Sequence, residues 1–225
     1  MGRSLSLAPL SMALGPRKNM KIARLYKYLS INHPGVWPYR RQLLVDRSLY
    51  FSDPTNFNDP LDCNIASAAS LKGALHKCRV FCLSGEEHDD YLMFAHYADG
   101  HRGFRLTFEV DMDKTLDEIG VLGRGQLVKY VPHFPPDFDM SNVHQSLLMK
   151  LKCWEYEKEY RIFAVENNNL KYDKNALVEV AFGCRMDPDF EPVIRSWVSQ
   201  GGHQRPIFRR VIMANKPDGF EYEDA

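Results

Sequence analysis

"DYLMFAHYADGHRGFRLTFEV", residues 90–110, joins two kinds of hydrophobic periodicity in one short stretch. Apolar residues in 90–99 recur every three to four positions, which is the spacing of a helix, whereas 104–110 alternates as a strand does. A helix therefore leads directly into a strand. This stretch predicts that both element types share one core.

The same periodicity maps the rest of the chain. Helices are predicted at the end of 35–46 and over 67–77, 140–154 and 187–200. Strands are predicted over 21–28, 48–52, 79–84, 125–131, 159–165, 176–182 and 206–213. Because the two types mix without a strict beta-alpha alternation, the pattern favours an α+β fold over a doubly wound one. The glycines of "GVLGRGQ" (120–126) lack the lysine that a phosphate-binding loop needs.

Length and composition predict one globular domain. The chain has 225 residues, of which 44% are hydrophobic, enough to bury one core. We assign this domain to residues 21–215, with a disordered arm at 1–20 and an acidic tail at 216–225. No run reaches the roughly eighteen apolar residues of a membrane span, so we expect no membrane partner. The scattered cysteines lead us to expect a cytoplasmic protein.

Charge and cysteine content narrow the function classes. Lys+Arg and Asp+Glu both number 29, so the average surface gives no electrostatic reason to bind nucleic acid. No acidic residue precedes Asp46, however, and that basic stretch is either an anion-binding face or a solvated one. The five cysteines are scattered and odd in number, which indicates reduced thiols. Cys78 and Cys82 lack the second half of a zinc site, and we predict no metal.

Four stretches together resemble the bacterial domain-of-unknown-function 2971 family. They are "LYKY" (25–28), "LYFSDPTNFNDPLD" (49–62), "FAHYADGHRGFRLTFE" (94–109) and "KCWEYEKEYRIF" (152–163). Their order and spacing carry the resemblance, which runs from about residue 22 to about residue 213. The family often looks like part of bacterial stress or anti-phage systems, so the resemblance implies a toxin-like effector.

Two of these stretches also resemble, more distantly, the ADP-ribosyltransferases. Those enzymes arrange a basic residue or His on a first strand, a Tyr or Ser on a second and a Glu on a later strand around NAD. "LYFSD" (49–53) resembles the strand of the poly(ADP-ribose) polymerase-like branch whose Tyr ring stacks on nicotinamide. "EKEYRIF" (157–163) resembles the Glu-bearing strand. The resemblance implies a mixed, mostly antiparallel split sheet with flanking helices, and NAD as the substrate.

The chemistry of NAD cleavage makes the Glu pair informative. Breaking the nicotinamide–ribose bond passes through an oxocarbenium-like state, which a carboxylate stabilises electrostatically. We expect Glu159 to be this catalytic carboxylate. Glu157 lies two positions earlier, on the same face of a strand, where it orients the nucleophile or accepts its proton, and Arg161 continues that face. The alternative is that these three residues form the solvated side of a half-buried strand.

Ligand contacts are predicted on the two earlier strands. Tyr50 and Ser52 share one face and form the nicotinamide wall, while Phe51 points to the core. Arg24 or Lys27 supplies the anionic contact, although Arg and Lys differ in geometry. His96 either lines the pocket or is a structural histidine. The full predicted set is Arg24, Tyr26, Lys27, Tyr50, Ser52, His96 and Arg161.

The sequence thus predicts an NAD-consuming, ADP-ribosyltransferase-like effector that transfers ADP-ribose to a macromolecule or to water. The macromolecule, a protein or a nucleic acid, and the oligomeric state do not follow from the sequence. Two alternatives stay open. One is a non-catalytic nucleotide sensor, and the other is a nucleic-acid-acting defence effector whose basic N-terminal region grips phosphate.

Overall fold

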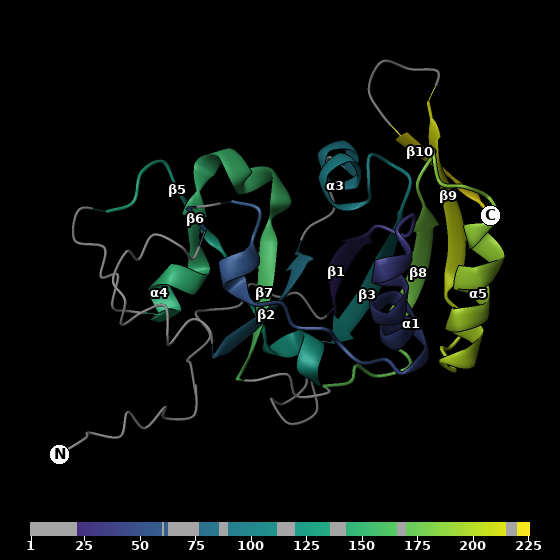
Figure 1. Cartoon of the computed structure of the whole chain (residues 1–225), viewed down its shortest axis with the longest axis horizontal. Coiled ribbons are helices and arrows are strands. Elements are labelled where there is room, and N and C mark those ends of the chain that lie inside the picture. Colours follow the sequence, from purple (N-terminus) through teal and green to yellow (C-terminus); the bar gives the residue numbers. More distant parts are fainter. Residues whose placement is uncertain are drawn as a thin grey trace.

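The computed structural model describes residues 22–59, 61–62, 77–85, 90–111, 120–135, 143–165, 170–214 and 220–225. In these ranges the chain forms an α+β fold around a mostly antiparallel sheet with the strand order β10-β9-β8-β3-β1-β2-β7-β4 (Figure 1). The strands are β1 (Ile22–Leu29), β2 (Cys78–Ser84), β3 (Phe104–Asp111), β4 (Gln126–Leu127), β7 (Glu159–Val165), β8 (Leu177–Phe182), β9 (Ile207–Met213) and β10 (Phe220–Asp224). The predicted α+β class is confirmed.

The sheet is nearly divided between β1 and β2. Strand β1 pairs with β3 along its whole length, yet it pairs with β2 only at Tyr26 and Ser84. Strand β2 instead pairs along its whole length with β7. The sheet therefore has one half made of β10, β9, β8, β3 and β1 and another made of β2, β7 and β4, which lie apart in Figure 1.

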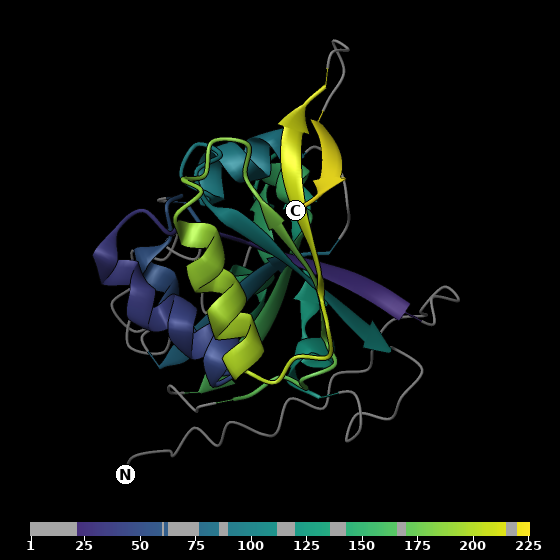
Figure 2. The ribbon, with the colours of Figure 1, turned by 90° about the vertical axis from the view of Figure 1, so that its right-hand side faces the viewer.

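Helices α1 (Trp37–Val45) and α5 (Phe190–Gln200) lie side by side over the larger half (Figure 2). Helix α5 buries Ile194, Trp197 and Val198, which share one face because they are three and four positions apart. These side chains join the main core with Leu25 and Leu29 of β1. Together they form the layer that supports the sheet from this side.

Helix α3 (Asp90–Tyr97) packs on the other face of β1. Tyr26 and Tyr28 alternate with the core residues of β1 and therefore point the opposite way. The ring of Tyr28 meets Phe94 of α3 edge-on, with centroids 5.2 Å apart. After α3 the chain turns tightly into β3, and a Cβ added to Gly103 would lie 2.0 Å from the carbonyl oxygen of Leu29. Only glycine allows this approach, which fixes α3 against β1.

Two predicted elements divide into several elements in the structure; residues 140–142 of the first lie outside the described residues. The predicted helix over 140–154 is helical in α4 (Val143–Leu148) and then becomes β6 (Met149–Leu151) and the 3-10 helix η4 (Lys152–Glu157). The predicted strand over 125–131 divides into β4 and β5 (Lys129–Val131), because Val128 donates a backbone hydrogen bond to Glu159 while β5 pairs with β6 in a second sheet. Further 3-10 helices are η1 (Pro34–Val36), η2 (Pro54–Asn56) and η3 (Val121–Arg124).

The predicted strand over 48–52 is wrong. This segment makes isolated bridges, Ser48 with Lys171 and Ser52 with Val80, and η2 begins directly after it at Pro54. Its side chains nevertheless alternate as expected, since Phe51 is 1% exposed in the core and Tyr50 is 41% exposed.

The acidic C-terminal segment contains a strand. Within the predicted tail over 216–225, Phe220–Asp224 form β10, and this edge strand places Glu223 opposite Arg210 and Asp224 opposite Arg209. Such cross-strand pairs of opposite charge stabilise a sheet edge. The predicted arm over 1–20 lies outside the described residues, as does all but the last residue of the predicted helix over 67–77.

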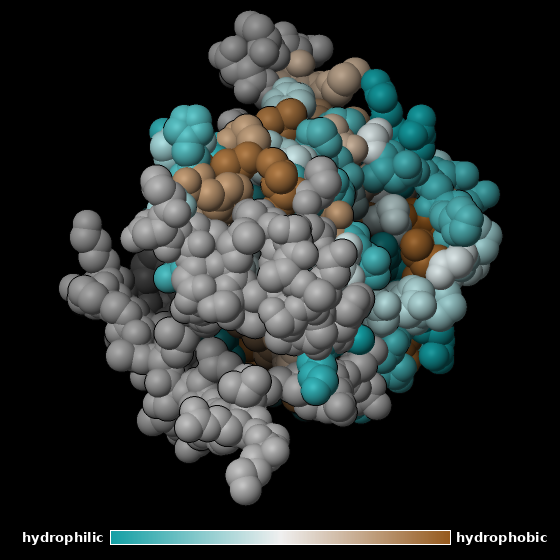
Figure 3. Space-filling model, turned by 60° about the vertical axis from the view of Figure 1, so that its left-hand side comes forward, coloured by the Kyte–Doolittle hydropathy of each residue, from teal (hydrophilic) through white to brown (hydrophobic). Residues whose placement is uncertain are grey.

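In the described ranges, no helix has the length and apolar character to cross a membrane. The described surface in Figure 3 is mostly hydrophilic, with small separate groups of hydrophobic side chains. Cys78, Cys82, Cys153 and Cys184 carry free thiols, and Cys63 lies outside the described residues.

Candidate functional site

A cavity of 370 Å³ lies where β1 and β2 separate. This volume is at the lower end of the range for small-molecule sites. Aromatic and charged side chains share its wall. Of the predicted site residues, Tyr26, Lys27, Ser52, His96, Glu157 and Glu159 line the cavity, whereas Arg24, Tyr50 and Arg161 do not.

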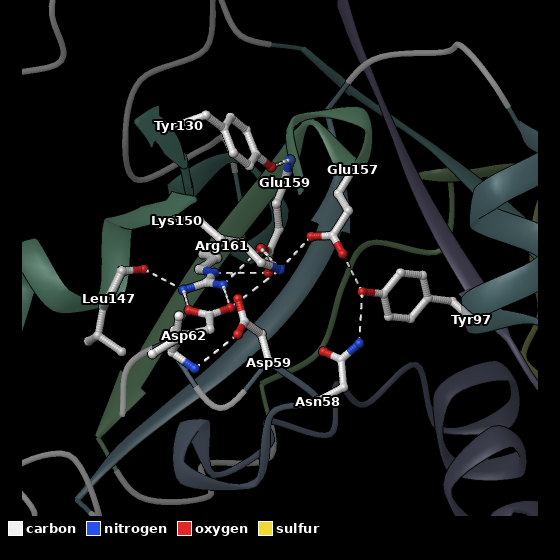
Figure 4. Close-up of polar contacts among 11 residues, drawn as sticks. Asn58, Asp59, Asp62, Tyr97, Tyr130, Leu147, Lys150, Glu157, Glu159 and Arg161 are labelled. Carbon is white, nitrogen blue, oxygen red and sulfur yellow. Dashed lines mark hydrogen bonds and ion pairs between the residues drawn. The ribbon is translucent and has the colours of Figure 1, made fainter. Parts of the chain in front are cut away.

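The two glutamates reach the cavity from a turn and not from a single strand. Glu157 ends η4 and Glu159 begins β7, so the prediction that both lie on one strand is wrong. Lys158 between them is left-handed (φ 43°), and its carbonyl accepts a hydrogen bond from the Gly85 N–H. Both carboxylates therefore meet one ammonium group, with the Nζ of Lys150 2.5 Å from Glu157 Oε2 and 3.4 Å from Glu159 Oε2 (Figure 4).

Arg161 does not line the cavity but binds two residues that do, Glu159 and Asp62. It is fully buried, and its guanidinium donates to both carboxylate oxygens of Glu159 at 2.8 Å and to Asp62 at 2.5 and 3.0 Å. It also donates to the Leu147 carbonyl and lies over the Phe57 ring. Glu157, Glu159 and Arg161 are thus buried, and the alternative of a solvated strand face is wrong.

Lys150 holds three carboxylates together. Besides the two glutamates, its Nζ lies 3.4 Å from Asp62. Burial alone would lower the pKa of Lys150, but Glu159, Asp62 and Glu157 together raise it above the usual lysine value. The sequence offers no signal for Lys150, because it lies in the segment predicted as helix, and no motif in the sequence singles out Asp62.

The two glutamates differ in acidity although they share Lys150. Burial raises the pKa of Glu157 above its usual value. Burial acts on Glu159 in the same direction, but the charges of Arg161 and Lys150 outweigh it and lower the pKa of Glu159 to about 2. A pair of carboxylates with separated pKa values is the usual arrangement for acid–base work.

Tyr97 of α3 completes the contacts of Glu157. Its hydroxyl donates a short hydrogen bond to Glu157 Oε1, and Asn58 lies 3.5 Å from the same hydroxyl (Figure 4). Burial, and then the negative charge of Glu157, raise the pKa of Tyr97. The sequence analysis predicts His96 as a site residue and does not predict Tyr97 beside it. In the described contacts Glu157 accepts one hydrogen bond on each oxygen, whereas Glu159 accepts three in all, two from Arg161 and one from Lys150, so Glu157 keeps more acceptor capacity.

Lys27 is the basic residue of β1 that enters the cavity. Its Nζ donates to the Cys82 carbonyl at 2.6 Å and lies 4.7 Å from the centre of the Phe81 ring. Burial is the main cause of its lowered pKa. Arg24, the other predicted anionic contact, is exposed and paired with Glu109, and this position explains why it does not reach the cavity.

Comparisons with protein-family models, with curated proteins and with solved structures found no match to this chain. In the part of the chain that the structure describes, no group of three or more His, Cys, Asp or Glu side chains is placed to hold a metal ion. The geometry of the cavity therefore carries the functional argument.

Proposed function

We propose that this protein cleaves the bond between nicotinamide and ribose in NAD and passes ADP-ribose to a macromolecule or to water. The observation that carries the proposal is that residues from all three motif segments converge on one cavity, although Tyr50 of the second segment does not line it. Lys27 of β1, Ser52 beside β2 and Glu159 of β7 all line it, as the resemblance to ADP-ribosyltransferases implies. The near-division of the sheet at this point agrees with the split sheet of that fold.

The surroundings of the two glutamates suggest a division of roles. We assign the substrate-facing role to Glu157, because its carboxylate keeps free acceptor positions and its raised pKa suits proton transfer. Glu159 is the positioning residue, since it holds Arg161 and Lys150 in place and stays ionised. The sequence analysis predicts Glu159 as the catalytic carboxylate and Glu157 as its accessory. The geometry favours the reverse assignment.

The reaction then follows from these positions. The bond between C1′ and the pyridinium nitrogen breaks, and its electron pair neutralises the leaving nicotinamide. The carboxylate of Glu157 stabilises the positive charge that develops on the ribose. Water or an acceptor group attacks C1′ and gives its proton to Glu157. The Lys27 ammonium would contact a phosphate of the same ligand.

The direct test is nicotinamide release by purified protein at millimolar NAD, measured by chromatography. Glu157→Gln should lower turnover by roughly 10²–10⁴-fold, because it removes the proton acceptor but keeps the shape. The matched control is Glu155→Gln, a neighbour in η4 that does not line the cavity, and it should retain wild-type turnover. A wild-type turnover in Glu157→Gln would overturn the assigned role.

A thermal melt separates this enzyme from the nucleotide-sensor alternative. A ligand at one hundred times its dissociation constant stabilises the folded state by about 2.7 kcal/mol. Stabilisation by NAD together with nicotinamide release supports the enzyme. Stabilisation without release indicates a sensor, and the absence of both would overturn NAD as the ligand.

A further inference from the structure

Two lysines line the cavity, and their partners differ. The Nζ of Lys150 lies within 3.4 Å of three carboxylates. The Nζ of Lys27 instead donates one hydrogen bond, to the Cys82 carbonyl at 2.6 Å, although an ammonium group has three donors. Among the residues that the structure describes, no carboxylate forms an ion pair with Lys27. Lys27 is therefore the lysine of this wall that keeps spare bonding capacity.

The surroundings of Lys27 favour its neutral form more than those of Lys150 do. Burial is the main cause that lowers the pKa of the Lys27 amine, and the positive charge of Arg40 acts in the same direction. The Phe81 ring, 4.7 Å from the Nζ, and the Cys82 carbonyl favour the ammonium form but do not outweigh burial. In Lys150 burial is outweighed by the three carboxylates, which raise its pKa and keep it protonated. Because only a neutral amine attacks a carbonyl carbon, Lys27 is the nucleophilic lysine of the two.

The wall around Lys27 suits a small ligand that carries hydroxyl groups. Lys27 is half-buried and lines the cavity, so a ligand inside the cavity reaches its amine. Ser52, Asn56 and Asn58 line the same cavity, and Glu157 keeps acceptor capacity there. Hydroxyl, amide and carboxylate groups of this kind form hydrogen bonds with the hydroxyls of a ligand. At 370 Å³ the cavity is at the lower end of the range for small-molecule sites, which favours a compact ligand.

We propose that Lys27 is a covalent capture site for small, uncharged polyhydroxy aldehydes, with which it forms a Schiff base. The Nζ attacks the carbonyl carbon and forms a carbon–nitrogen bond, and the carbon–oxygen bond then breaks. The two protons of the neutral amine leave with that oxygen as water, so the step needs no oxidant or reductant. An anion in the cavity would favour the ammonium form of Lys27, and for this reason the captured aldehyde carries no charge. The capture does not depend on the proposed function, but its adduct and a bound NAD would exclude each other.

The test incubates the full chain with glyceraldehyde and sodium cyanoborohydride at neutral pH, because the hydride reduces the Schiff base to a stable secondary amine. Peptide mapping by mass spectrometry then measures the rate of labelling at each lysine. Lys27 should be labelled roughly tenfold faster than Lys129, an exposed lysine of β5 that does not line the cavity, because more of Lys27 is neutral. Lys150 should be labelled more slowly than Lys129. Labelling of Lys27 no faster than that of Lys129, or equal labelling of the two cavity lysines, would overturn the proposal.

Two matched variants identify the lysine that forms the adduct. In intact-protein mass spectra the wild-type protein should gain a single adduct in a fast phase. Lys27→Arg should lose this phase, because arginine keeps the charge and length but offers no amine that forms a Schiff base. Lys129→Arg should keep the fast phase. A fast phase that persists in Lys27→Arg would overturn the site.

The labelling needs no NAD, so its outcome is distinct from a failure of the proposed function. Fast labelling of Lys27 without nicotinamide release supports the capture site and counts against NAD cleavage. Nicotinamide release with slow labelling of Lys27 overturns the capture site and leaves the enzyme. Where both activities are present, millimolar NAD should slow the labelling of Lys27 and not that of Lys129, because NAD occupies the same cavity.

Discussion

Arg105 and Arg161 make a natural comparison, because each is a fully buried arginine within a strand of the same sheet. Arg105 lies in β3, in the larger half of the sheet, and Arg161 lies in β7, in the smaller half. Both are at most 1% exposed, and both guanidinium groups lie about 5 Å from aromatic rings, of Tyr26 and Tyr222 for Arg105 and of Phe57 for Arg161. Their surroundings nevertheless differ.

Arg105, Thr107, Glu179, Arg209 and Tyr222 form what we call the closed cluster. It meets Glu179 at 2.6 Å, and the same carboxylate also contacts Thr107 and, at 3.5 Å, Arg209. Tyr222 of the edge strand β10 accepts a hydrogen bond from Arg105. One carboxylate thus lies between two arginines.

Arg161 belongs to a second cluster, with Asp62, Lys150, Glu157 and Glu159, which we call the open cluster because it borders the cavity. Two cations, Arg161 and Lys150, face the three carboxylates of Asp62, Glu157 and Glu159. All three carboxylates line the cavity. A buried ion pair is therefore weak evidence of function when taken alone. The excess of carboxylate and the opening to a cavity distinguish the second cluster.

The largest expected effect is a loss in the free energy of unfolding that is greater when Arg161 is replaced than when Arg105 is replaced. Arg161→Met leaves Asp62 and Glu159 buried with Lys150 as their remaining cation, and such a loss costs about 3–5 kcal/mol. Arg105→Met should cost clearly less, because Glu179 keeps Arg209. Urea denaturation followed by circular dichroism measures both. Equal losses would show that the extra carboxylates of the open cluster do not matter.

The next largest effect is a loss of stability at acidic pH that comes from Glu159 in the open cluster. The pKa of Glu159 is lowered to about 2 in the folded state, against about 4.3 for an unperturbed Glu. Its contribution to the free energy of unfolding is fully present above the unfolded pKa and is lost as pH falls from about 5 towards 2. The amount is on the order of 2–3 kcal/mol. Glu157 acts in the opposite direction, since its pKa is raised and its protonated form is favoured in the folded state.

Denaturation midpoints between pH 7 and 2.5 test this expectation. The wild-type protein should lose stability more steeply with acid than Glu159→Gln, which has no carboxyl group to titrate at this position. Glu155→Gln serves as the control and should follow the wild-type curve. Parallel curves for wild type and Glu159→Gln would mean that Glu159 does not carry the acid dependence.

Features that depend on local sequence were predicted, whereas features that depend on contacts between distant segments were not. The helix over 90–99 and the strand over 104–110 were predicted correctly, because their apolar periodicity is local. The buried state of Phe51 was predicted for the same reason. By contrast, Lys150 joins the site through the pairing of β5 with β6, a non-local contact that overrode the helical pattern of 140–154.

The site was recovered only in part for a similar reason. Six of the nine predicted site residues line the cavity, and the glutamates were found because their spacing resembled a known motif. The left-handed turn at Lys158, the hydroxyl of Tyr97 and the distance of Tyr50 from the cavity depend on backbone geometry and packing between distant segments. No residue pattern in the chain encodes these features directly.

A smaller effect comes from removing one hydroxyl from each cluster. Tyr97→Phe removes the hydrogen bond to Glu157 and the long one from Asn58, and Tyr222→Phe removes the hydrogen bond from Arg105. Each substitution should cost about 0.5–1.5 kcal/mol. Only Tyr97→Phe should change catalysis. Its hydrogen bond favours the ionised form of Glu157, so its loss should move the acidic limb of the pH–rate profile to higher pH. If the acidic limb of the pH–rate profile stays in place in Tyr97→Phe, Tyr97 does not influence the proton transfer.

The smallest expected change in stability, and the one that tests how the open cluster is built, is Lys158→Gly. The left-handed backbone (φ 43°) costs a residue with a Cβ about 1–2 kcal/mol, whereas glycine adopts it freely but loses about 0.5–1 kcal/mol more entropy on folding. The net expectation is a gain in stability of less than about 1 kcal/mol. Arg205→Gly, at φ 51° and away from the cavity, is the matched control and should show the same gain. Turnover should fall only in Lys158→Gly, because the freed backbone no longer holds Glu157 and Glu159 on the same ammonium group. If both glycine variants keep full turnover, the left-handed turn shapes the chain without positioning the carboxylates.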